Sequence, residues 1–416
     1  MPPSSSGAGR RPSPWALILL LALLQSVTPL SVDLYLPALP TIARALHTAQ
    51  GPLNLTLSAF MIGFAVGQLI WGPVGDRFGR KGPMILGLAL YVAASAGCAL
   101  STDVWALVGW RIVQALGGCA LPVLGSAMVR DCFEREEGAQ VRSLMQMVGA
   151  VAPMLAPLVG GQLMLLGSWR LLFWVLTGFG ALCLFAALAL TETLDAASRR
   201  ELHPVSMARG YAELFTDRAY LAWVLPAGLT GAGMFAYISG TPFVYIDYFH
   251  VPPQAYGLFF GLNMLGMVGA SALNSALVRR QGPDRLFLIG CGVVCVAGLA
   301  VAATGVSGIG GLPVLAAAIF VFVATMGPNS ANAAAEALAE FPHKAGAAAA
   351  LMGFISMGLG SIAGALVGIL ADGTPRPMAI IMGVIGVSAL VSHVVLLKPR
   401  SRPDASGRGM LNRWRG

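Results

Sequence analysis

Long apolar segments separated by short polar stretches run along almost the whole chain. Twelve of them are long enough to cross a bilayer as helices, since about 20 helical residues span the hydrocarbon layer. Helices are expected because open lipid-facing strands would leave backbone groups without hydrogen bonds. The predicted spans are 15–36, 53–71, 83–100, 104–129, 144–166, 171–190, 220–245, 256–278, 286–306, 312–335, 345–370 and 377–397.

The composition also indicates a membrane protein. The 416 residues are 56% hydrophobic and 11% charged, with a mean hydropathy of +0.75, whereas soluble domains carry about 25% charged residues. The first span resembles a signal peptide, but it is a full span long and no small-residue cleavage site follows before Asp33, so we expect it to be retained. The sequence therefore predicts an all-α membrane protein.

Basic residues give the orientation, because cytoplasmic loops hold the excess of Lys and Arg. If both termini are inside, 22 of the 26 Lys and Arg residues lie on the inner side and 3 on the outer side, with Arg111 inside a span. The net charge of +8 is thus explained by topology, so we expect no nucleic-acid partner. The basic C-terminal tail is a candidate contact for anionic lipid.

A polar interruption divides the twelve spans six and six. The two halves repeat at an offset of about 204 residues, with Gly160 matching Gly364 and the loop 76–79 matching 279–282. This pattern predicts a two-bundle transporter with its cavity between the bundles. The expected parts are a cytoplasmic tail (1–14), a six-helix bundle (15–191), a cytoplasmic linker with an amphipathic stretch near 211–215 (192–218), a second six-helix bundle (219–398) and a basic tail (399–416).

Two ionisable residues lie inside the spans of the first half. Asp33 is near the end of the first span and Arg111 is in the fourth, at similar predicted depths. Charged residues inside a membrane are costly and mark functional sites by default. We expect Arg111 to hold Asp33 ionised and protonation of Asp33 to release the pair, a charge change that couples protons to conformation. The alternative is a permanent ion pair that only tethers the two helices.

The loop after the second span is rich in glycine and basic residues. Short inner loops are often basic for topological reasons alone, but here every position of a family signature matches: the loop resembles that of the major facilitator superfamily. The resemblance implies a conformational latch formed by Gly72, Gly75, Asp76, Arg77, Gly79, Arg80 and Lys81. We expect Asp76 to face the positive N-terminus of the helix that begins near Ala345.

Two further motifs support the resemblance. The run Arg111, Gln114, Gly117, Gly118 is similar to the superfamily's proton-coupling motif, although Ala115 replaces the usual glycine. The fifth span resembles the antiporter motif of drug exporters through Gly149, Pro153, Pro157, Gly160 and Gly161, with Ala156 departing from many relatives. The prolines bend the helix and the glycines allow close packing.

The exit of the first span is the most specific feature. Asp33, Pro37 and Pro40 lie in a run that resembles the Bcr/CflA (bicyclomycin and chloramphenicol resistance) branch of the twelve-span drug:proton antiporters. The resemblance covers nearly the whole chain. It implies the major facilitator fold and export of small drugs across the bacterial inner membrane, driven by inward proton flow. We expect small-molecule drugs, protons and the lipid bilayer as partners, and a monomer.

The substrate pocket is predicted from polar, aromatic and soft residues within spans, of the kind that line adaptable sites. Because some relatives carry a second acid where this chain has Gln25, we expect one principal protonatable site and neutral or zwitterionic drugs. The alternative for each pocket residue is interhelical packing. The candidates are Gln25, Tyr35, Gln114, Tyr237, Asn263, Asn329, Phe354 and Met357, while Asn332, Glu336 and His393 stay unassigned.

Other functional classes are less well supported. Proton-coupled uptake or export of a metabolite on the same fold is the main alternative, and the fifth-span motif favours drug export. A membrane enzyme or channel is disfavoured because no metal-ligand cluster, nucleophile and base pattern or phosphate loop is evident. The six cysteines are interpreted as small apolar residues and not as a metal site or disulfide framework. We therefore expect no metal, and no cofactor beyond the proton gradient.

Overall fold

The structure is a computed structural model that describes residues 14–195, 204–341 and 344–397. These residues form helices and connecting turns, with no strand among them. Eleven helices of the described part are long and apolar enough to cross a membrane, and α6 contributes a shorter apolar stretch, Val151–Leu166. The predicted all-α membrane fold is confirmed. The two predicted tails lie almost entirely outside the described residues.

The first half of the chain forms seven helices and one short turn of 3₁₀ helix, η1. They are α1 (Pro14–Asp33), η1 (Leu36–Ala38), α2 (Leu39–Ala45), α3 (Gln50–Phe78), α4 (Lys81–Leu100), α5 (Val104–Cys132), α6 (Arg135–Leu166) and α7 (Arg170–Leu188). Pro37 and Pro40 lie at the starts of η1 and α2, where a missing N–H costs nothing. The chain therefore leaves α1 through two tight helical turns directly after Asp33.

The second half begins with the linker helix and contains one π-helical segment, η3. Its elements are α8 (Pro204–Thr216), α9 (Arg218–Pro242), η3 (Phe243–Tyr248), α10 (Pro253–Gln281), α11 (Pro283–Ser307), α12 (Gly311–Ala324), α13 (Met326–Glu340), α14 (Ala345–Ile369) and α15 (Arg376–Leu396). The predicted amphipathic stretch of the linker lies in α8. The domain boundaries at 191 and 218 stay a prediction.

Several boundaries differ from the prediction. The span predicted at 312–335 lies within one apolar span, Gly311–Glu340, which is interrupted at Thr325 between α12 and α13. The interruption is expected because Pro328 has no N–H to donate to the carbonyl of Ala324, where α12 ends. Two helices also extend past their apolar stretches: α6 begins at Arg135, nine residues before its predicted start, and α3 ends at Phe78. Hydropathy detects only the part of a helix that lies in hydrocarbon.

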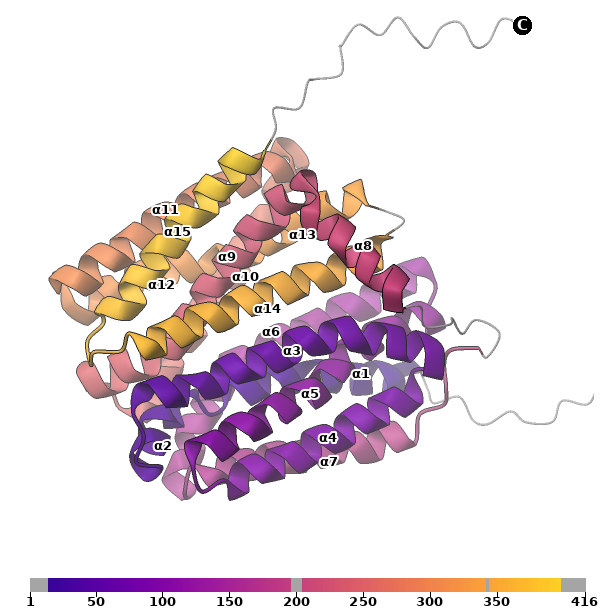
Figure 1. The fold of residues 1–416 in the computed structure, drawn as a ribbon, viewed down its shortest axis with the longest axis horizontal. Coiled ribbons are helices and arrows are strands. Elements are labelled where there is room, and N and C mark those ends of the chain that lie inside the picture. Colours follow the sequence, from indigo (N-terminus) through magenta and orange to yellow (C-terminus); the bar gives the residue numbers. More distant parts are fainter. Residues whose placement is uncertain (1–13, 196–203, 342–343, 398–416) are drawn as a thin grey trace, which may run out of the picture.

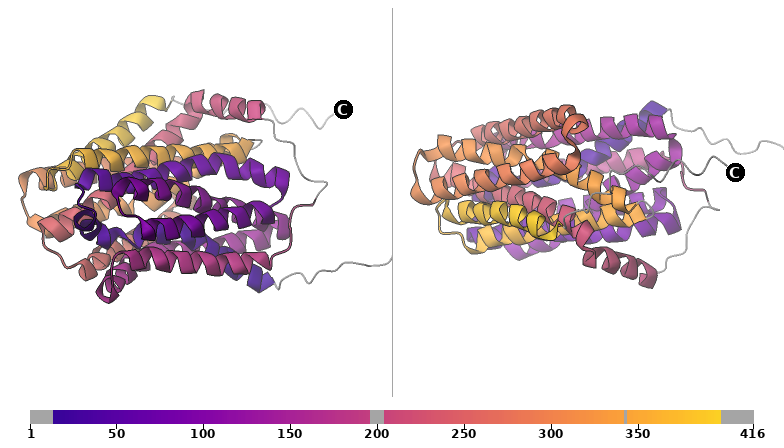
Figure 2. Two further views of the ribbon diagram at one scale, coloured as in Figure 1. Left: turned by 60° about the horizontal axis from the view of Figure 1, so that its bottom comes forward. Right: turned by 90° about the horizontal axis from the view of Figure 1, so that it is seen from above.

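The two halves pack side by side along two seams, α3 against α14 and α6 against α10 (Figure 1). We name the two ends of the molecule by their elements. The α2 face carries α2 and η3, and the α8 face carries α8 and the loop 72–81. Figure 2 shows α8 at the edge of the molecule, outside the packed helices. The segment that follows Asp33 lies where the halves meet, because η1 contacts α6 of the first half and α9 and α10 of the second.

Candidate functional site

Arg111 of α5 lies in the interior of the first half with no exposed surface. Its Nη1 donates to the carbonyl oxygen of Ser31 at 2.9 Å and to Oε1 of Gln114 at 2.7 Å. The guanidinium carbon lies 4.5 Å from the ring centre of Tyr35 and 4.3 Å from that of Phe60. Such contacts stabilise a cation most where water is excluded. Arg111 is thus held by a carbonyl, an amide and two aromatic faces, while Nε and Nη2 have no described hydrogen-bond partner.

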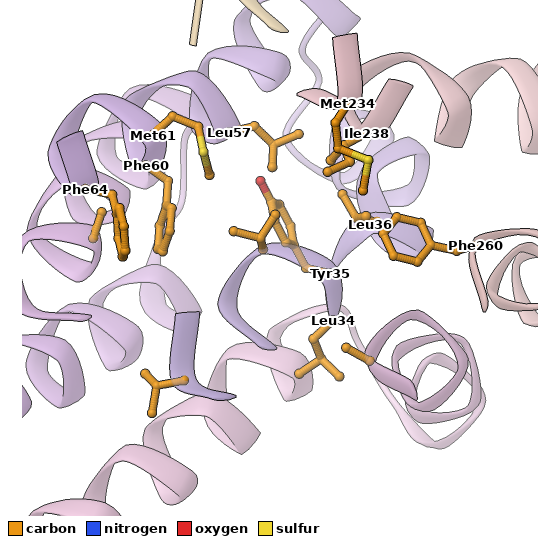
Figure 3. Close-up of a cluster of buried hydrophobic side chains, with 14 of the residues drawn as sticks. Leu34, Tyr35, Leu36, Leu57, Phe60, Met61, Phe64, Met234, Ile238 and Phe260 are labelled. Atoms are coloured by element: carbon orange, nitrogen blue, oxygen red, sulfur yellow. The ribbon is translucent and has the colours of Figure 1, made fainter. Parts of the chain in front are cut away.

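Gln114 and Tyr35, both predicted to line the substrate pocket, hold this arginine. The Nε2 of Gln114 donates to Oγ of Ser95 at 2.8 Å, which orients its carbonyl oxygen toward Arg111. The Tyr35 hydroxyl is 3.1 Å from Oγ1 of Thr56. In Figure 3, Tyr35 lies beside Leu57 of α3, whereas Leu36 lies beside Phe260 of the second half. Gln114 and Tyr35 are both fully buried.

Asp33 is also buried, with 4% of its surface exposed, but it does not pair with Arg111. No described residue forms an ion pair or hydrogen bond with its carboxylate, so the predicted Asp33–Arg111 ion pair is wrong for this conformation. The reason is geometric. Asp33 follows Ser31 by two residues, which places their side chains about 200° apart around a helix of 3.6 residues per turn. Since the Ser31 hydroxyl faces α4, where it bonds to Tyr91 at 2.8 Å, Asp33 points away from this side of α1.

Asp33 ends α1 shortly before η1, the segment that contacts α9 and α10 of the second half. Leu36 of η1 lies beside Phe260 (Figure 3), whose ring packs against those of Tyr237 on α9 and Tyr256 on α10. Nδ2 of Asn263 donates to the Tyr237 oxygen at 2.9 Å, and the Tyr256 hydroxyl lies 3.0 Å from Oγ1 of Thr241. Two of the predicted pocket residues, Tyr237 and Asn263, are thus brought together opposite Asp33.

The glycines of the antiporter motif bring other elements to α6. A methyl group on Gly160 would overlap the carbonyl oxygen of Leu34, and one on Gly161 would lie 3.0 Å from the carbonyl oxygen of Pro253 on α10. One on Gly149 would lie 3.2 Å from Cγ of Gln25. Pro153 and Pro157 lie within α6. The predicted close packing at the glycines is confirmed, and it includes the turn that follows Asp33.

The remaining predicted pocket residues are dispersed. Gln25 packs against Gly149, and its Oε1 is buried without a described partner. Asn329 packs against Gly290 of α11, inside the second half. Phe354 lines an apolar cavity of about 370 Å³ at the α8 face, together with Leu69, Tyr211 and Phe215. Met357 is half-buried against the core. These four do not gather around Asp33.

The loop 72–81 forms a charge cluster inside the first half. Arg80 donates from Nη1 to Asp76 at 2.7 Å and from Nε to Asp131 at 2.9 Å. Arg80, four residues along the chain, binds Oδ1 of Asp76, and the expectation that Asp76 faces the start of α14 stays a prediction. Both acids raise the pKa of Arg80 above its usual value although burial opposes this. The cluster joins the end of α3, the start of α4 and the end of α5 within the first half.

Glu192, the first residue of the predicted linker, stabilises the same loop. Burial disfavours its charge, but backbone N–H groups of Arg80, Lys81, Thr193 and Leu194 outweigh burial and lower the pKa of Glu192. The first two donors belong to the start of α4, where a helix favours a negative charge. Gly79 adopts φ +89° here, and a side chain there would overlap the Glu192 carboxylate. The sequence did not predict roles for Glu192 and Asp131. The only signal in the sequence was that each acid follows the end of a predicted span on the same side as the basic loop 72–81.

The residues left unassigned lie in the second half. Asn332 exchanges two hydrogen bonds with Asn274 of α10, at 2.9 and 3.1 Å. The Nδ1 of His393 lies 2.9 Å from the carbonyl oxygen of Ala222, and its ring packs against Trp223 and Phe287. Glu336 lies on α13. The contacts of Asn332 and His393 are interhelical and lie within one half.

Known proteins show similarity over nearly the full length. The sequence model of the Major Facilitator Superfamily matches residues 21–365. The chain is 36% identical to the uncharacterized MFS-type transporter YdgK of Bacillus subtilis over 92% of this chain and 96% of that protein. It is 32% identical to the bicyclomycin resistance protein homolog of Haemophilus influenzae, with the same coverage.

The solved structure of the nucleoside transporter NupG shares the fold, with a TM-score of 0.73 at 13% identity over 93% of this chain and 99% of that one. At this identity the similarity concerns the fold alone. The relatives agree with the resemblance to drug:proton antiporters seen in the motifs. The family match covers more than half of the chain, and the helices pack as in a transporter of this fold. The chain therefore belongs to the major facilitator superfamily.

Proposed function

We propose that this protein exports small drugs from the bacterial cytoplasm in exchange for protons, by alternating access. Full-length similarity to a protein named a bicyclomycin resistance protein homolog supports drug export. So does 31% identity over 53% of this chain to the multidrug resistance protein MdtL of Escherichia coli. The antiporter-motif glycines of α6, which pack on the turn after Asp33, fit the same function.

The observation that carries the proposal is the state of Asp33. Its carboxylate is buried beside the seam between the halves and has no hydrogen-bond donor among the described residues. Arg111 is held by Ser31 and Gln114 instead. Protonation of Asp33 thus breaks no bond in this conformation, while it removes a charge from the boundary between two bodies that must move. A proton can bias two conformations only if its site differs between them.

The arrangement of the seams supports alternating access with the α2 face closed. Gly51 and Gly368 meet there, and Oγ of Ser361 donates to the carbonyl oxygen of Ser58 at 3.0 Å across the seam. The side-chain nitrogen and oxygen of Asn54 are buried in the same seam without a described partner. Unpaired buried polar groups cost about 1–3 kcal/mol each. This seam therefore gains hydration when it opens, as a gate must.

The distribution of basic residues supports the orientation. The 22 to 3 distribution of Lys and Arg supports an orientation with the α8 face in the cytoplasm and the α2 face outside. We accordingly propose the bacterial inner membrane as the location, with both termini cytoplasmic and the protein acting as a monomer. Protons then enter from the α2 face and drugs from the α8 face.

Drug susceptibility tests the proposal. A bacterium lacking its own drug pumps would express the protein, Asp33→Asn, or Asp195→Asn, an exposed acid of the α8-face loop chosen as the matched control. Growth would be measured in bicyclomycin and chloramphenicol. We expect resistance from the wild type and the control and none from Asp33→Asn. Equal resistance from Asp33→Asn would refute proton coupling through this residue.

A further inference from the structure

Tyr237 of α9 carries a hydroxyl proton that no described residue accepts. Asn263 donates to its oxygen at 2.9 Å, so the oxygen is the acceptor in this bond and the proton points elsewhere. The ring is fully buried and stacks on Phe260, with ring centres 5.7 Å apart. The hydroxyl is therefore an oriented donor without an acceptor, and buried groups of this kind are rare.

Asp33 is the complementary group, a buried acceptor without a described donor. Asp33 is followed closely by η1, which contacts α9 and α10. Leu36 of η1 lies beside Phe260, on which Tyr237 stacks (Figure 3). No direct hydrogen bond joins Asp33 and Tyr237 in this conformation. A water molecule or a small movement of η1 against α9 would connect the two. A charged acceptor makes a bond about twice as strong as a neutral one.

The other groups around Asp33 leave Tyr237 as the available partner. Arg111 and Tyr35 are engaged with each other on the α5 side of α1. The Tyr256 hydroxyl is within hydrogen-bond distance of Thr241. The apolar part of α6, Val151–Leu166, contains no titratable residue.

We infer that Tyr237, positioned by Asn263, is the second half's share of the proton-coupling site and donates a hydrogen bond to the ionised Asp33 carboxylate once a water molecule or a movement of η1 connects the two. This inference rests on the proposed role of Asp33 as the proton carrier. The tyrosine keeps its own proton throughout, and the proton that Asp33 gains comes from the aqueous phase. Protonation of Asp33 weakens this hydrogen bond between the two halves. The charge on α1 therefore changes how strongly α1 is held to α9, the helix that carries Tyr237. Tyr237 is thus a positioning residue and not a drug contact.

Infrared difference spectroscopy of the drug-free protein in lipid nanodiscs tests this inference. The carbonyl stretch of a protonated carboxyl group would be followed against pH in the wild type, with Asp33→Asn assigning the band. In Tyr237→Phe, which keeps the ring and its stacking, we expect half-protonation of Asp33 at about tenfold lower proton concentration, the effect of losing a hydrogen bond to a charged group. Tyr245→Phe is the matched control, because its buried hydroxyl has no described partner.

The outcomes separate the two proposals. An Asp33 band that titrates alike in the wild type and Tyr237→Phe would overturn the inference and leave the proposed function standing. A spectrum in which Asp33→Asn removes no titrating band would overturn both. Binding of bicyclomycin to the purified protein gives a second readout: unchanged affinity in Tyr237→Phe supports a positioning role, and a loss at every pH would make Tyr237 a drug contact instead.

Discussion

Arg44 of α2 and Asp247 of η3 form an ion pair across the α2 face, with 3.4 Å between Nη1 and Oδ1. The two residues are 203 positions apart, close to the offset of about 204 between the halves of the sequence. His47 and His250 repeat the relationship, and both adopt positive φ, +48° and +56°. Equivalent turns of the two halves therefore meet at this face. Arg44, His47 and Asp247 border a surface depression of about 980 Å³, whose lining includes Gly51 and Gly368 of the closed seam.

Removing this ion pair should favour opening of the α2 face by a small amount. The two side chains are 67% and 44% exposed, so we expect Arg44→Ala or Asp247→Ala to cost at most about 1 kcal/mol. Distances between spin labels on α2 and η3 would report a larger open population in either variant. The exchanged pair, Arg44→Asp with Asp247→Arg, should restore the wild-type distribution. An exchanged pair as open as the single variants would show that the contact has no influence on the gate.

Gly160→Ala should damage both folding and transport. The added methyl group would overlap the Leu34 carbonyl oxygen, which belongs to the backbone and cannot rotate away. Overpacking of this kind costs about 1–3 kcal/mol, and relief would displace the turn that follows Asp33. Melting temperature in detergent and drug resistance in cells are the measurements. The control is Gly178→Ala on α7, where a methyl group meets nothing within 4 Å. Equal behaviour of the two variants would contradict the packing argument.

Most of the fold could be predicted because each membrane-spanning helix requires a long uninterrupted run of apolar residues, which is visible in the sequence. The exceptions have local causes. Pro328 interrupts one predicted span, because the carbonyl of Ala324 has no N–H of Pro328 to accept from. In addition, α6 begins with polar residues that precede its apolar part. Neither the interruption of a helix nor its polar extension can be predicted from the length of a span or from its mean hydropathy.

The site was predictable in its residues and less so in its contacts. Asp33 and Arg111 stand out as charges in apolar helices, but opposite charge alone suggested an ion pair. The direction of each side chain depends on the exact register of α1 against α5. In this register Arg111 bonds to Ser31 and Gln114 and packs against two aromatic rings. Contacts between distant segments, such as Glu192 with the start of α4, depend on tertiary packing that the sequence alone does not reveal.

The stability of the α8 face should depend on pH through Glu192. Its pKa lies below the usual value of 4.5, so its stabilising contribution is present above that value and is lost as the pH falls through the lower pKa of the folded state. Glu192→Gln should lower stability at neutral pH by about 1 kcal/mol, as for loss of a helix cap. The variant should also lose part of the acid dependence. Melting temperature from neutral pH down to below pH ~4 measures both effects, with Asp195→Asn as the control. Parallel curves for wild type and Glu192→Gln would exclude the role.

Gln114→Leu should reduce transport by misplacing Arg111 and not by removing a drug contact. The substitution keeps most of the side-chain volume but deletes the amide oxygen that accepts from Nη1 at 2.7 Å. Hydrogen bonds to charged groups contribute about 1.5–3 kcal/mol, and the guanidinium already has two nitrogens without a described partner. Gln114→Glu supplies an oxygen at the same place and should retain more transport than Gln114→Leu, while both should leave bicyclomycin affinity near that of the wild type. If instead both variants lost affinity in proportion to transport, Gln114 would belong to the drug pocket, as its place in the fourth span first suggested.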